Sequence, residues 1–260
     1  MDNLFSLKDK VAIVTGSGRG IGAGIARVFA DAGAAVAVTG RTTSEVEATA
    51  AAIRAKGGRA IAITVDITDK SQLPAVIDRT VAEFGGIDIL VNNAGGSMSP
   101  AFLDTKMEQI ESLFRLIVAA PFEISRLAVP HMLKRPGASI INILSPGVTR
   151  FPRGNLAYYT VKAALGQMTK LMAADLGPKI RVNGITPGPV ETPALVKIMQ
   201  EKPEVREAAM RATRMRRFAK SEEIGYAALY LCSPAATFVT GSILPVNGGE
   251  VEEQRGTPDL

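Results

Sequence analysis

A tyrosine and a lysine four residues apart are the most reactive pairing in the sequence. Tyr158 and Lys162 fall in the stretch Ala157–Leu176, whose apolar spacing predicts a helix, so both side chains would lie on one face. A neighbouring ammonium favours the charged form of a phenol and brings its pKa towards the range where it exchanges a proton. Tyr159 is an equally plausible phenol by composition, but only Tyr158 is followed by a lysine four residues later. The pair is a candidate site for acid–base chemistry.

A serine placed just after a predicted strand extends this candidate site. Ser145 follows the expected strand Ser139–Leu144 and precedes Tyr158 by thirteen residues. A hydroxyl there can hydrogen-bond the oxygen that exchanges a proton with Tyr158 and can hold a carbonyl group in line. Ser145, Tyr158 and Lys162 are therefore the predicted catalytic residues.

A glycine-rich turn near the N-terminus is a candidate phosphate-binding site. Glycines let the backbone turn tightly and approach a pyrophosphate, and the helix that follows supplies free N–H groups and a positive dipole end. The spacing does not meet the strict G-x-G-x-x-G pattern, and no P-loop lysine follows. Its place between the first expected strand and the first expected helix nevertheless favours a dinucleotide. The predicted contacts are Gly16, Ser17, Gly18, Arg19, Gly20, Ile21 and Gly22.

The end of the second predicted strand bears on which nicotinamide cofactor is bound. A carboxylate at that place would accept a hydrogen bond from a free ribose 2′-hydroxyl and would repel a 2′-phosphate. The segment Val38–Thr42 has no carboxylate, and its Arg41 can bind a phosphate with two hydrogen bonds. Arg19 would add a second cation nearby. The two arginines favour NADP(H), with NAD(H) as the alternative.

Short apolar runs predict seven strands. Their interiors are almost entirely Val, Ile, Leu and Ala, which is typical of strands that are covered on both faces. The strands are expected over Val11–Thr15, Ala35–Thr39, Ala60–Val65, Ile87–Asn92, Ser139–Leu144, Ile180–Ile185 and Ser242–Val246.

Longer stretches of helical spacing separate these strands. The helices are expected over Ile21–Ala32, Ser44–Lys56, Ser71–Phe84, Met107–Val118, Glu123–Leu133, Ala157–Leu176 and Glu222–Cys232. Repeated strand–helix alternation requires right-handed crossovers and a parallel sheet. We therefore predict an α/β fold, with residues 1–260 forming a single doubly wound domain and helices on both faces of a seven-stranded sheet.

One segment interrupts the alternation. Residues 187–219, between the sixth and seventh strands, contain several prolines among amphipathic pieces, and insertions at the carboxyl ends of strands commonly build substrate pockets. Four apolar residues are further candidates for lining a substrate pocket: Met98, Phe102, Met199 and Met210. A basic cluster made of Arg211, Arg214, Arg216 and Arg217 is expected to form a solvated face, with an anchor for an acidic substrate or a carrier-protein partner as the alternative.

Composition excludes several classes of protein. The net charge is only +5, with 30 basic and 25 acidic residues spread along the chain, which argues against nucleic-acid binding. A single cysteine, Cys232, excludes an intrachain disulfide, and a single histidine, His131, gives a metal site little support. No secretory signal begins the chain, and no stretch approaches the roughly 18 apolar residues of a membrane span. We expect a cytoplasmic protein that binds neither nucleic acid nor membranes.

Taken together, these motifs resemble the short-chain dehydrogenase/reductase family over nearly the whole chain. Besides the glycine turn, the marks of the resemblance are Asp66-Ile67 after the third strand, Asn92-Asn93-Ala94-Gly95 after the fourth, Ser145, the Tyr158–Lys162 pair and Pro187-Gly188 after the sixth. The resemblance to 3-oxoacyl carrier-protein reductases within the family is general, and residues 187–219 do not match them closely enough to assign that substrate.

The resemblance implies a Rossmann fold and an NADP(H)-dependent enzyme that interconverts a ketone or aldehyde with an alcohol. It also implies a homotetramer packed through the helices Met107–Leu133 and Ala157–Leu176. In the family, Asp66 would bind the adenine edge and Thr192 the nicotinamide carboxamide. Beyond the glycine turn, the cofactor contacts that it implies are Arg41, Asp66, Ile67, Asn92, Ala94, Gly95, Tyr158, Lys162, Pro187, Gly188, Val190 and Thr192.

The chain departs from the family pattern at one position. Ile117 stands where the family often carries an Asn that binds a water linking the catalytic lysine to solvent. An isoleucine offers no such hydrogen bond, so either the proton relay follows another route or turnover is impaired. This position is the argument for one alternative, a weakly active cofactor-binding or scaffold protein. The other alternative is an NAD(H)-dependent alcohol dehydrogenase of the same fold.

Overall fold

The computed structural model describes residues 4–96, 100–149, 154–193, 195–196, 200, 206–207, 210–211 and 213–249. Two of the candidate pocket residues, Met98 and Met199, lie outside the described residues, as does much of the 187–219 segment.

Seven parallel strands form one central sheet. They are β1 (Val11–Val14), β2 (Ala35–Gly40), β3 (Arg59–Thr64), β4 (Ile89–Asn92), β5 (Ala138–Ile143), β6 (Ile180–Pro187) and β7 (Ile243–Val246), in the order β3-β2-β1-β4-β5-β6-β7. In the central register, Val14 of β1 lies between Val38 of β2 and Val91 of β4. Every residue of β1, β4 and β5 is buried, as their apolar sequences require. The predicted seven-stranded sheet is confirmed.

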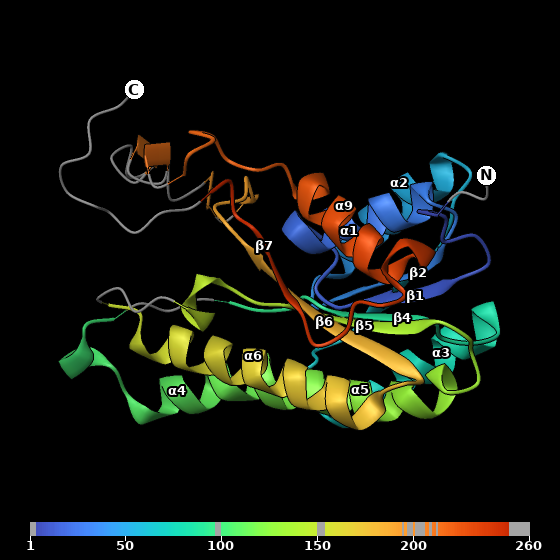
Figure 1. Cartoon of the computed structure of the whole chain (residues 1–260), viewed down its shortest axis with the longest axis horizontal. Coiled ribbons are helices and arrows are strands. Elements are labelled where there is room, and N and C mark those ends of the chain that lie inside the picture. The colour runs from blue at the N-terminus through green and yellow to red at the C-terminus, as the bar shows by residue number, and fades with distance from the viewer. Residues whose placement is uncertain are drawn as a thin grey trace.

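Helices cover both faces of this sheet (Figure 1). One face carries α1 (Gly20–Asp31), α2 (Thr43–Ala55) and α9 (Ser221–Cys232). The other carries α3 (Leu73–Phe84), α4 (Met107–Phe114), α5 (Ala120–Met132) and α6 (Leu156–Leu176). Each layer has its own apolar core, with Phe29 of α1 and Leu231 of α9 buried on the first face and Ile77 of α3 and Met132 of α5 on the second. The predicted doubly wound arrangement is confirmed.

The helix before β5 is longer than the sequence indicated. We expected a break between Val118 and Glu123, but α4 continues into α5 through a π-helical turn, η2 (Arg115–Ala119). In this turn the N–H of Ala120 donates to the carbonyl of Arg115, five residues back. The wider turn accommodates Pro121, which has no N–H to donate and whose ring clashes with a regular helix. The predicted break was therefore wrong.

The carboxyl ends of the strands meet along one edge of the sheet. The loops after β1, β4, β5 and β6 all begin there because the strands are parallel. The chain order reverses between β1 and β4, and such a switch point leaves a crevice in which α/β proteins bind ligands. In the part of the chain that the structure describes, no helix combines the length and the apolar character that crossing a membrane would require.

Candidate active site

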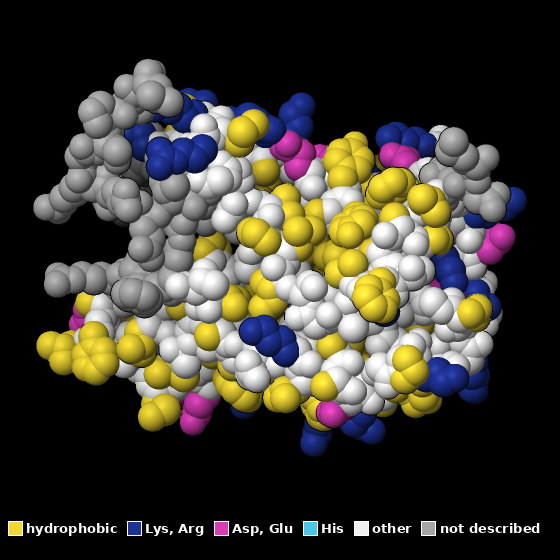
Figure 2. Space-filling view, viewed as in Figure 1, with side chains coloured by type: hydrophobic (Ala, Val, Ile, Leu, Met, Phe, Trp, Pro, Cys, Tyr) yellow, Lys and Arg dark blue, Asp and Glu magenta, His cyan; other side chains and the backbone are white. Residues whose placement is uncertain are grey.

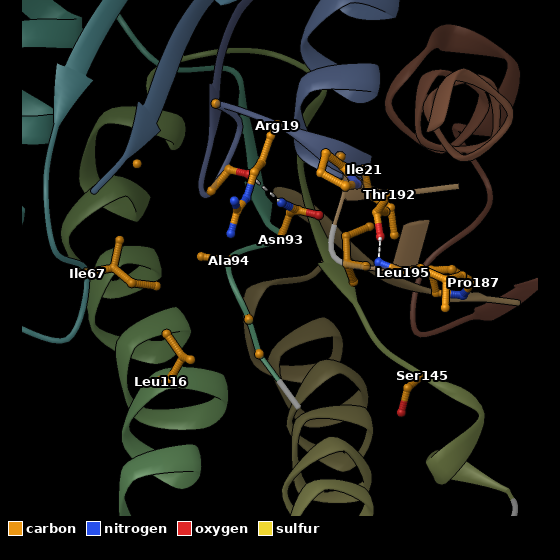
Figure 3. Close-up of a pocket in the computed structure, with 18 of the residues that line it drawn as sticks. Arg19, Ile21, Ile67, Asn93, Ala94, Leu116, Ser145, Pro187, Thr192 and Leu195 are labelled. Carbon is orange, nitrogen blue, oxygen red and sulfur yellow. Dashed lines mark hydrogen bonds between the residues drawn. The ribbon is translucent and has the colours of Figure 1, made fainter. Parts of the chain in front are cut away.

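A cavity of about 730 Å³ occupies this crevice. One end is lined by the loops after β2 and β3, and the other by the loop after β5 and the start of α6 (Figure 3). Most of the predicted site residues line it: Gly16, Gly18, Arg19, Gly20, Ile21, Arg41, Asp66, Ile67, Ala94, Gly95, Ser145, Tyr158, Lys162, Pro187, Gly188 and Thr192. The structure thus brings residues from all along the sequence to one place.

The glycine turn has a conformation that depends on glycine. Gly16 and Gly20 have φ angles of 63° and 57°, in the left-handed region that side chains disfavour. A Cβ on Gly16 would lie 2.8 Å from the Cα of Ala94, so the turn packs directly on the loop after β4. Helix α1 then begins at Gly20 without a side-chain cap on its first N–H groups. The glycines keep the backbone of the turn accessible at their positions, and the turn ends in N–H groups suited to an anion.

Four of the predicted cofactor contacts are not among the described residues that line the cavity, but they support the residues that do. Ser17 donates to the carbonyl of Val14 at 2.6 Å and accepts from the N–H of Thr39 at 2.9 Å, which holds the turn to the sheet. Val190 is buried and forms a parallel β-bridge with Ala219, near the two ends of the segment 187–219. The other two, Gly22 and Asn92, lie beneath the loop after β4.

The loop after β4 presents Asn93 rather than Asn92. Asn92 is buried and donates to Asn142 Oδ1 at 2.8 Å and to Ser125 Oγ at 3.2 Å, between the sheet and the helices behind it. Asn93 lines the cavity, where its Nδ2 donates to the carbonyls of Thr15 and Gly16 at 2.8 and 3.0 Å. A side chain on Gly22 would overlap this amide. We had assigned the cofactor contact to Asn92. Neighbouring side chains along a strand point to opposite faces, so Asn92 and Asn93 could not both face the cavity, and this alternation is the signal in the sequence that separates them.

The predicted catalytic residues converge at the other end of the cavity. Ser145 and Lys162 are 5% and 4% exposed, so this end is nearly dry. Ser145 Oγ accepts a hydrogen bond from the N–H of Gly147 at 3.3 Å, which leaves its own proton free to donate. Lys162 Nζ donates to the carbonyl of Ile143 at 2.7 Å and lies 5.8 Å from the centre of the Tyr158 ring.

Burial controls the protonation of this end. It raises the pKa of Tyr158 to about 12, against the opposing effect of a hydrogen bond with Ser145, and it lowers the pKa of Lys162 to about 8. We had expected the lysine to lower the pKa of the tyrosine, and this expectation was wrong for the structure described here. The ammonium is bonded to a backbone carbonyl and not to the phenol, so desolvation dominates. Tyr158 is therefore a neutral phenol near pH 7, ready to donate a proton.

The second tyrosine has a separate structural relation to the site. Tyr159 also lines the cavity, with its ring centre 5.8 Å from that of Tyr158. Its ring packs so closely on Gly147 that a side chain at that glycine would overlap it. Because Gly147 supplies the N–H that orients Ser145, the Tyr159 ring supports the serine. Sequence reasoning missed this role, since the contact joins residues on different elements.

The end of the cavity that contains Arg19 and Arg41 also contains two carboxylates. Asp66 accepts hydrogen bonds from the N–H and the hydroxyl of Thr68 at 2.9 and 2.8 Å; these bonds lower its pKa, and the charge of Arg41 adds to the effect. Arg19 Nη1 lies 3.3 Å from Glu45 Oε1, on the first turn of α2. Both groups of this ion pair line the cavity, and sequence reasoning missed Glu45.

Ile117 lies in the π-helical turn η2 and is fully buried. Its side chain packs in an apolar cluster with Leu113, Val161 and Leu165. The residue four positions after Ile117 is Pro121, which has no N–H to donate to the carbonyl of Ile117 as a regular helix would require. The side chain of Ile117 belongs to the apolar cluster and is not among the described residues that line the cavity.

Apolar side chains make up much of the cavity lining. Leu116 lies across the cavity from Ser145, on the same side as Ile67, and Pro187 lies nearer to the serine (Figure 3). The apolar lining consists of Leu116, Leu144, Pro146, Pro187, Pro189, Pro193 and Leu195.

The basic cluster lies away from the cavity, as far as the structure describes it. Arg217 forms a bidentate pair with Glu223 at 2.7 Å, and Arg211 lies 3.4 Å from Glu207. These pairs are exposed, as expected for a solvated face. The described residues contain no group of three or more histidine, cysteine or acidic side chains able to hold a metal ion.

Comparisons with known proteins agree with this geometry. A family model described as enoyl-(acyl carrier protein) reductase matches residues 16–250. The chain is 41% identical to 7α-hydroxysteroid dehydrogenase of Escherichia coli over 97% of this chain and 98% of that protein. It is 32% identical to a 3-oxoacyl-[acyl-carrier-protein] reductase of Thermotoga maritima, over 94% and 99% of the two chains.

Two solved structures extend the likeness to three dimensions. A 7α-hydroxysteroid dehydrogenase complexed with NADH and 7-oxo glycochenodeoxycholic acid superimposes with a TM-score of 0.92, at 40% identity, over 97% of this chain and 99% of that one. L-sorbose reductase from Gluconobacter frateurii, complexed with NADPH and L-sorbose, gives a TM-score of 0.91 at 32% identity, over 95% and 98%. Both nicotinamide cofactors thus occur among the structural neighbours.

Proposed function

The chain belongs to the short-chain dehydrogenase/reductase family, and we propose that it is an NADP(H)-dependent oxidoreductase that interconverts a ketone or aldehyde with an alcohol. The observation that carries the proposal is the convergence of Ser145, Tyr158 and Lys162 at the dry end of a cavity that continues to the glycine turn. The chain would act as one dinucleotide-binding domain, with residues 187–219 as its substrate loop.

The residues of the cavity fit a dinucleotide along its whole length. The glycine turn leaves room for a pyrophosphate beside the first N–H groups of α1, where an anion is stabilised. Arg41 and Arg19 suit a 2′-phosphate at the adenosine end, which is why we propose NADP(H) over NAD(H). A nicotinamide bound at the Tyr158 end would supply or accept the hydride.

The chain's own residues would then handle the oxygen of the substrate. Tyr158, neutral near pH 7, donates its proton to a carbonyl oxygen that is being reduced, and takes it back from an alcohol that is being oxidised. Ser145, oriented by the N–H of Gly147, donates a hydrogen bond to the same oxygen. Lys162 stabilises the negative charge left on Tyr158, because its ammonium is held close to the ring.

The apolar part of the cavity lining favours an apolar substrate. Leucines and prolines line the cavity, among them Leu144 and Pro146 on either side of Ser145 in the chain, so a bulky apolar ketone would bury more apolar surface there than a small polar one. A relative that is named a hydroxysteroid dehydrogenase, and is alike over nearly its whole length, makes an oxo-steroid a reasonable first member of a substrate panel.

We also propose a homotetramer in the cytoplasm, packed through α4, α5 and α6. These helices carry exposed apolar side chains, among them Met107, Phe114, Phe122 and Leu171. In Figure 2, apolar side chains gather at the lower left, over the short turn η1 (Phe102–Asp104) that precedes α4 in Figure 1, where Phe102 and Leu103 are exposed. An apolar face of this kind is typical of subunit contacts, and sedimentation measurements of the purified protein would test the assembly.

The deciding experiment is a panel of ketones and aldehydes, oxo-steroids included, offered with NADPH or NADH to the wild type and to Tyr158→Phe. Loss of the phenol should lower the rate by about 10²- to 10⁴-fold, the usual contribution of a positioned acid. Ile117→Val serves as a control for a conservative change near the site. Equal rates in the wild type and Tyr158→Phe would overturn the assignment and favour a cofactor-binding or scaffold protein. A preference for NADH would overturn the cofactor alone.

A further inference from the structure

The adenosine end of the cavity is electrically balanced in spite of its two arginines. Arg19 and Arg41 face Glu45 and Asp66, so the formal charges of the four lining residues cancel. One oxygen of Asp66, Oδ1, accepts both hydrogen bonds from Thr68. That of Glu45 faces Arg19, one of the two cations that a 2′-phosphate would use.

Packing holds Glu45 in this place. A Cβ on Gly18 would lie 2.9 Å from the Cβ of Glu45, so the first turn of α2 rests directly on the glycine turn. Thr49, one helical turn later, donates to the carbonyl of Gly18 at 2.9 Å and secures the contact. The backbone of Glu45 therefore stays at the rim of the cavity whatever its side chain does.

The ion pair itself is open to exchange. The side chains of Arg19 and Glu45 are 62% and 36% exposed, and pairs with this much water around them contribute little net stability. Arg19, whose side chain points into the cavity in Figure 3, can leave the carboxylate for a phosphate at small cost. An anion that binds there meets the repulsion of Glu45 in addition to the attraction of Arg19 and Arg41.

We propose that Glu45 is a specificity-determining residue that weakens the preference of this protein for a ribose 2′-phosphate over a free 2′-hydroxyl. Its carboxylate competes with the phosphate for Arg19 and repels the phosphate charge, whereas a neutral hydroxyl is little affected. The inference rests on the proposed dinucleotide site and concerns the balance between the two cofactors within it.

The test measures binding of adenosine 2′,5′-bisphosphate and of adenosine 5′-monophosphate by calorimetry, without a substrate. Glu45→Gln should bind the bisphosphate about 3- to 10-fold more tightly than the wild type does, and the monophosphate within about twofold. Glu47→Gln is the matched control. Glu47 lies on the same helix and changes the net charge equally, but it pairs with Arg54 at 3.7 Å and is not among the described lining residues.

A second variant tests whether the effect passes through Arg19. In an Arg19→Gln background, Glu45→Gln should gain less for the bisphosphate than it does in the wild type, because the competition for the guanidinium has been removed. Glu45→Ala provides an independent removal of the carboxylate. Unfolding temperatures of all variants verify that they fold.

The outcomes separate this inference from the proposed function. If Glu45→Gln and Glu45→Ala behave like Glu47→Gln towards both nucleotides, the role of Glu45 is overturned, even where the wild type prefers the bisphosphate. If the wild type prefers the monophosphate, the NADP(H) assignment fails, while a selective gain for the bisphosphate in Glu45→Gln still supports the inference. Absence of binding of either nucleotide to any variant overturns both.

Discussion

The two ends of the cavity differ in how far water reaches their charged groups. At the catalytic end, Ser145 and Lys162 are almost completely buried, and each makes a hydrogen bond to the backbone. At the adenosine end, Arg19 and Glu45 form an ion pair that water surrounds. Water screens charges and offers alternative hydrogen bonds, so a group in the dry end interacts more strongly with its neighbours than a group in the wet end.

This difference separates the two tasks of the site. Chemistry requires a proton donor and a hydrogen-bond donor held in fixed positions, which a dry and closely packed environment provides. Choice of cofactor depends on a balance of exposed charges, which single substitutions shift by modest factors. Substitutions at the dry end should therefore have large and mutually dependent effects, and those at the wet end small and independent ones.

Among substitutions that leave Ser145, Tyr158 and Lys162 in place, the largest effect is expected from Gly147→Ala. The added methyl group would overlap the ring of Tyr159 and displace the N–H that orients Ser145, lowering kcat by about 10- to 100-fold with little change in the KM for the cofactor. The double variant Gly147→Ala/Tyr159→Ala removes the overlap and should recover part of the lost kcat. Steady-state kinetics of Gly147→Ala, Tyr159→Ala and the double variant measure this coupling, and additive losses would show that the ring does not support the serine.

The second expectation concerns pH. Reduction requires a charged Lys162 beside a protonated Tyr158. Because the pKa of Lys162 is about 8, kcat/KM should decline as the pH rises through about 8, by up to tenfold per pH unit. Tyr158 should not contribute to this decline, because it keeps its proton until about pH 12.

Stability should respond to the same lysine in the opposite direction. The folded protein holds the proton of Lys162 less tightly than the unfolded chain does. The free energy of unfolding should therefore rise as the pH increases from about 8 to about 10. Above about pH 10 it should fall again, because folded Tyr158 keeps its proton more tightly than the unfolded chain does. The control for both pH dependences is Lys162→Met. Its kcat/KM should be lower at every pH, and neither its kcat/KM nor its free energy of unfolding should change slope near pH 8. A wild-type kcat/KM that stays constant between pH 7 and 9 would contradict this account of the dry end.

A smaller effect is expected at the wet end. Arg41→Ala removes one cation near a 2′-phosphate and should raise the KM for NADPH about tenfold while leaving the KM for NADH and kcat nearly unchanged. Arg59→Ala, which removes an exposed arginine at the start of β3, is the control of equal charge. Equal changes for both cofactors would place Arg41 outside the 2′-phosphate site.

The smallest effect on turnover is expected from Ile117→Asn. A buried amide among Leu113, Val161 and Leu165 should destabilise the fold by about 1–3 kcal/mol, as seen in thermal unfolding. Turnover should stay within about twofold, because Ile117 is not among the described residues that line the cavity, and Ser145, Tyr158 and Lys162 are unchanged. A clear rise in turnover would show that a proton relay through this position limits the wild type.

Most of the fold was predictable because its determinants are local. Apolar runs of strand length, helical spacing and the glycines after β1 specify a parallel sheet with few alternatives, and a parallel sheet gathers the ends of its strands at one edge. That is why Gly16, Ser145 and Pro187 could be assigned to one site before their positions were known. The continuous helix from α4 to α5 was not predictable, because Pro121 ordinarily interrupts a helix and only the π-helical turn makes room for it.

By itself, the sequence determined the order of the elements, the shared edge of the sheet and the set of residues that could do chemistry there, because all three follow from spacing along the chain. Tertiary structure alone decided which of two adjacent asparagines faces the cavity, that Glu45 from α2 meets Arg19, and that the Tyr159 ring rests on Gly147. It also decided the direction of the Tyr158 pKa shift. The physical reason is that contacts between elements and the loss of water depend on how the elements pack, and no spacing within one element encodes them.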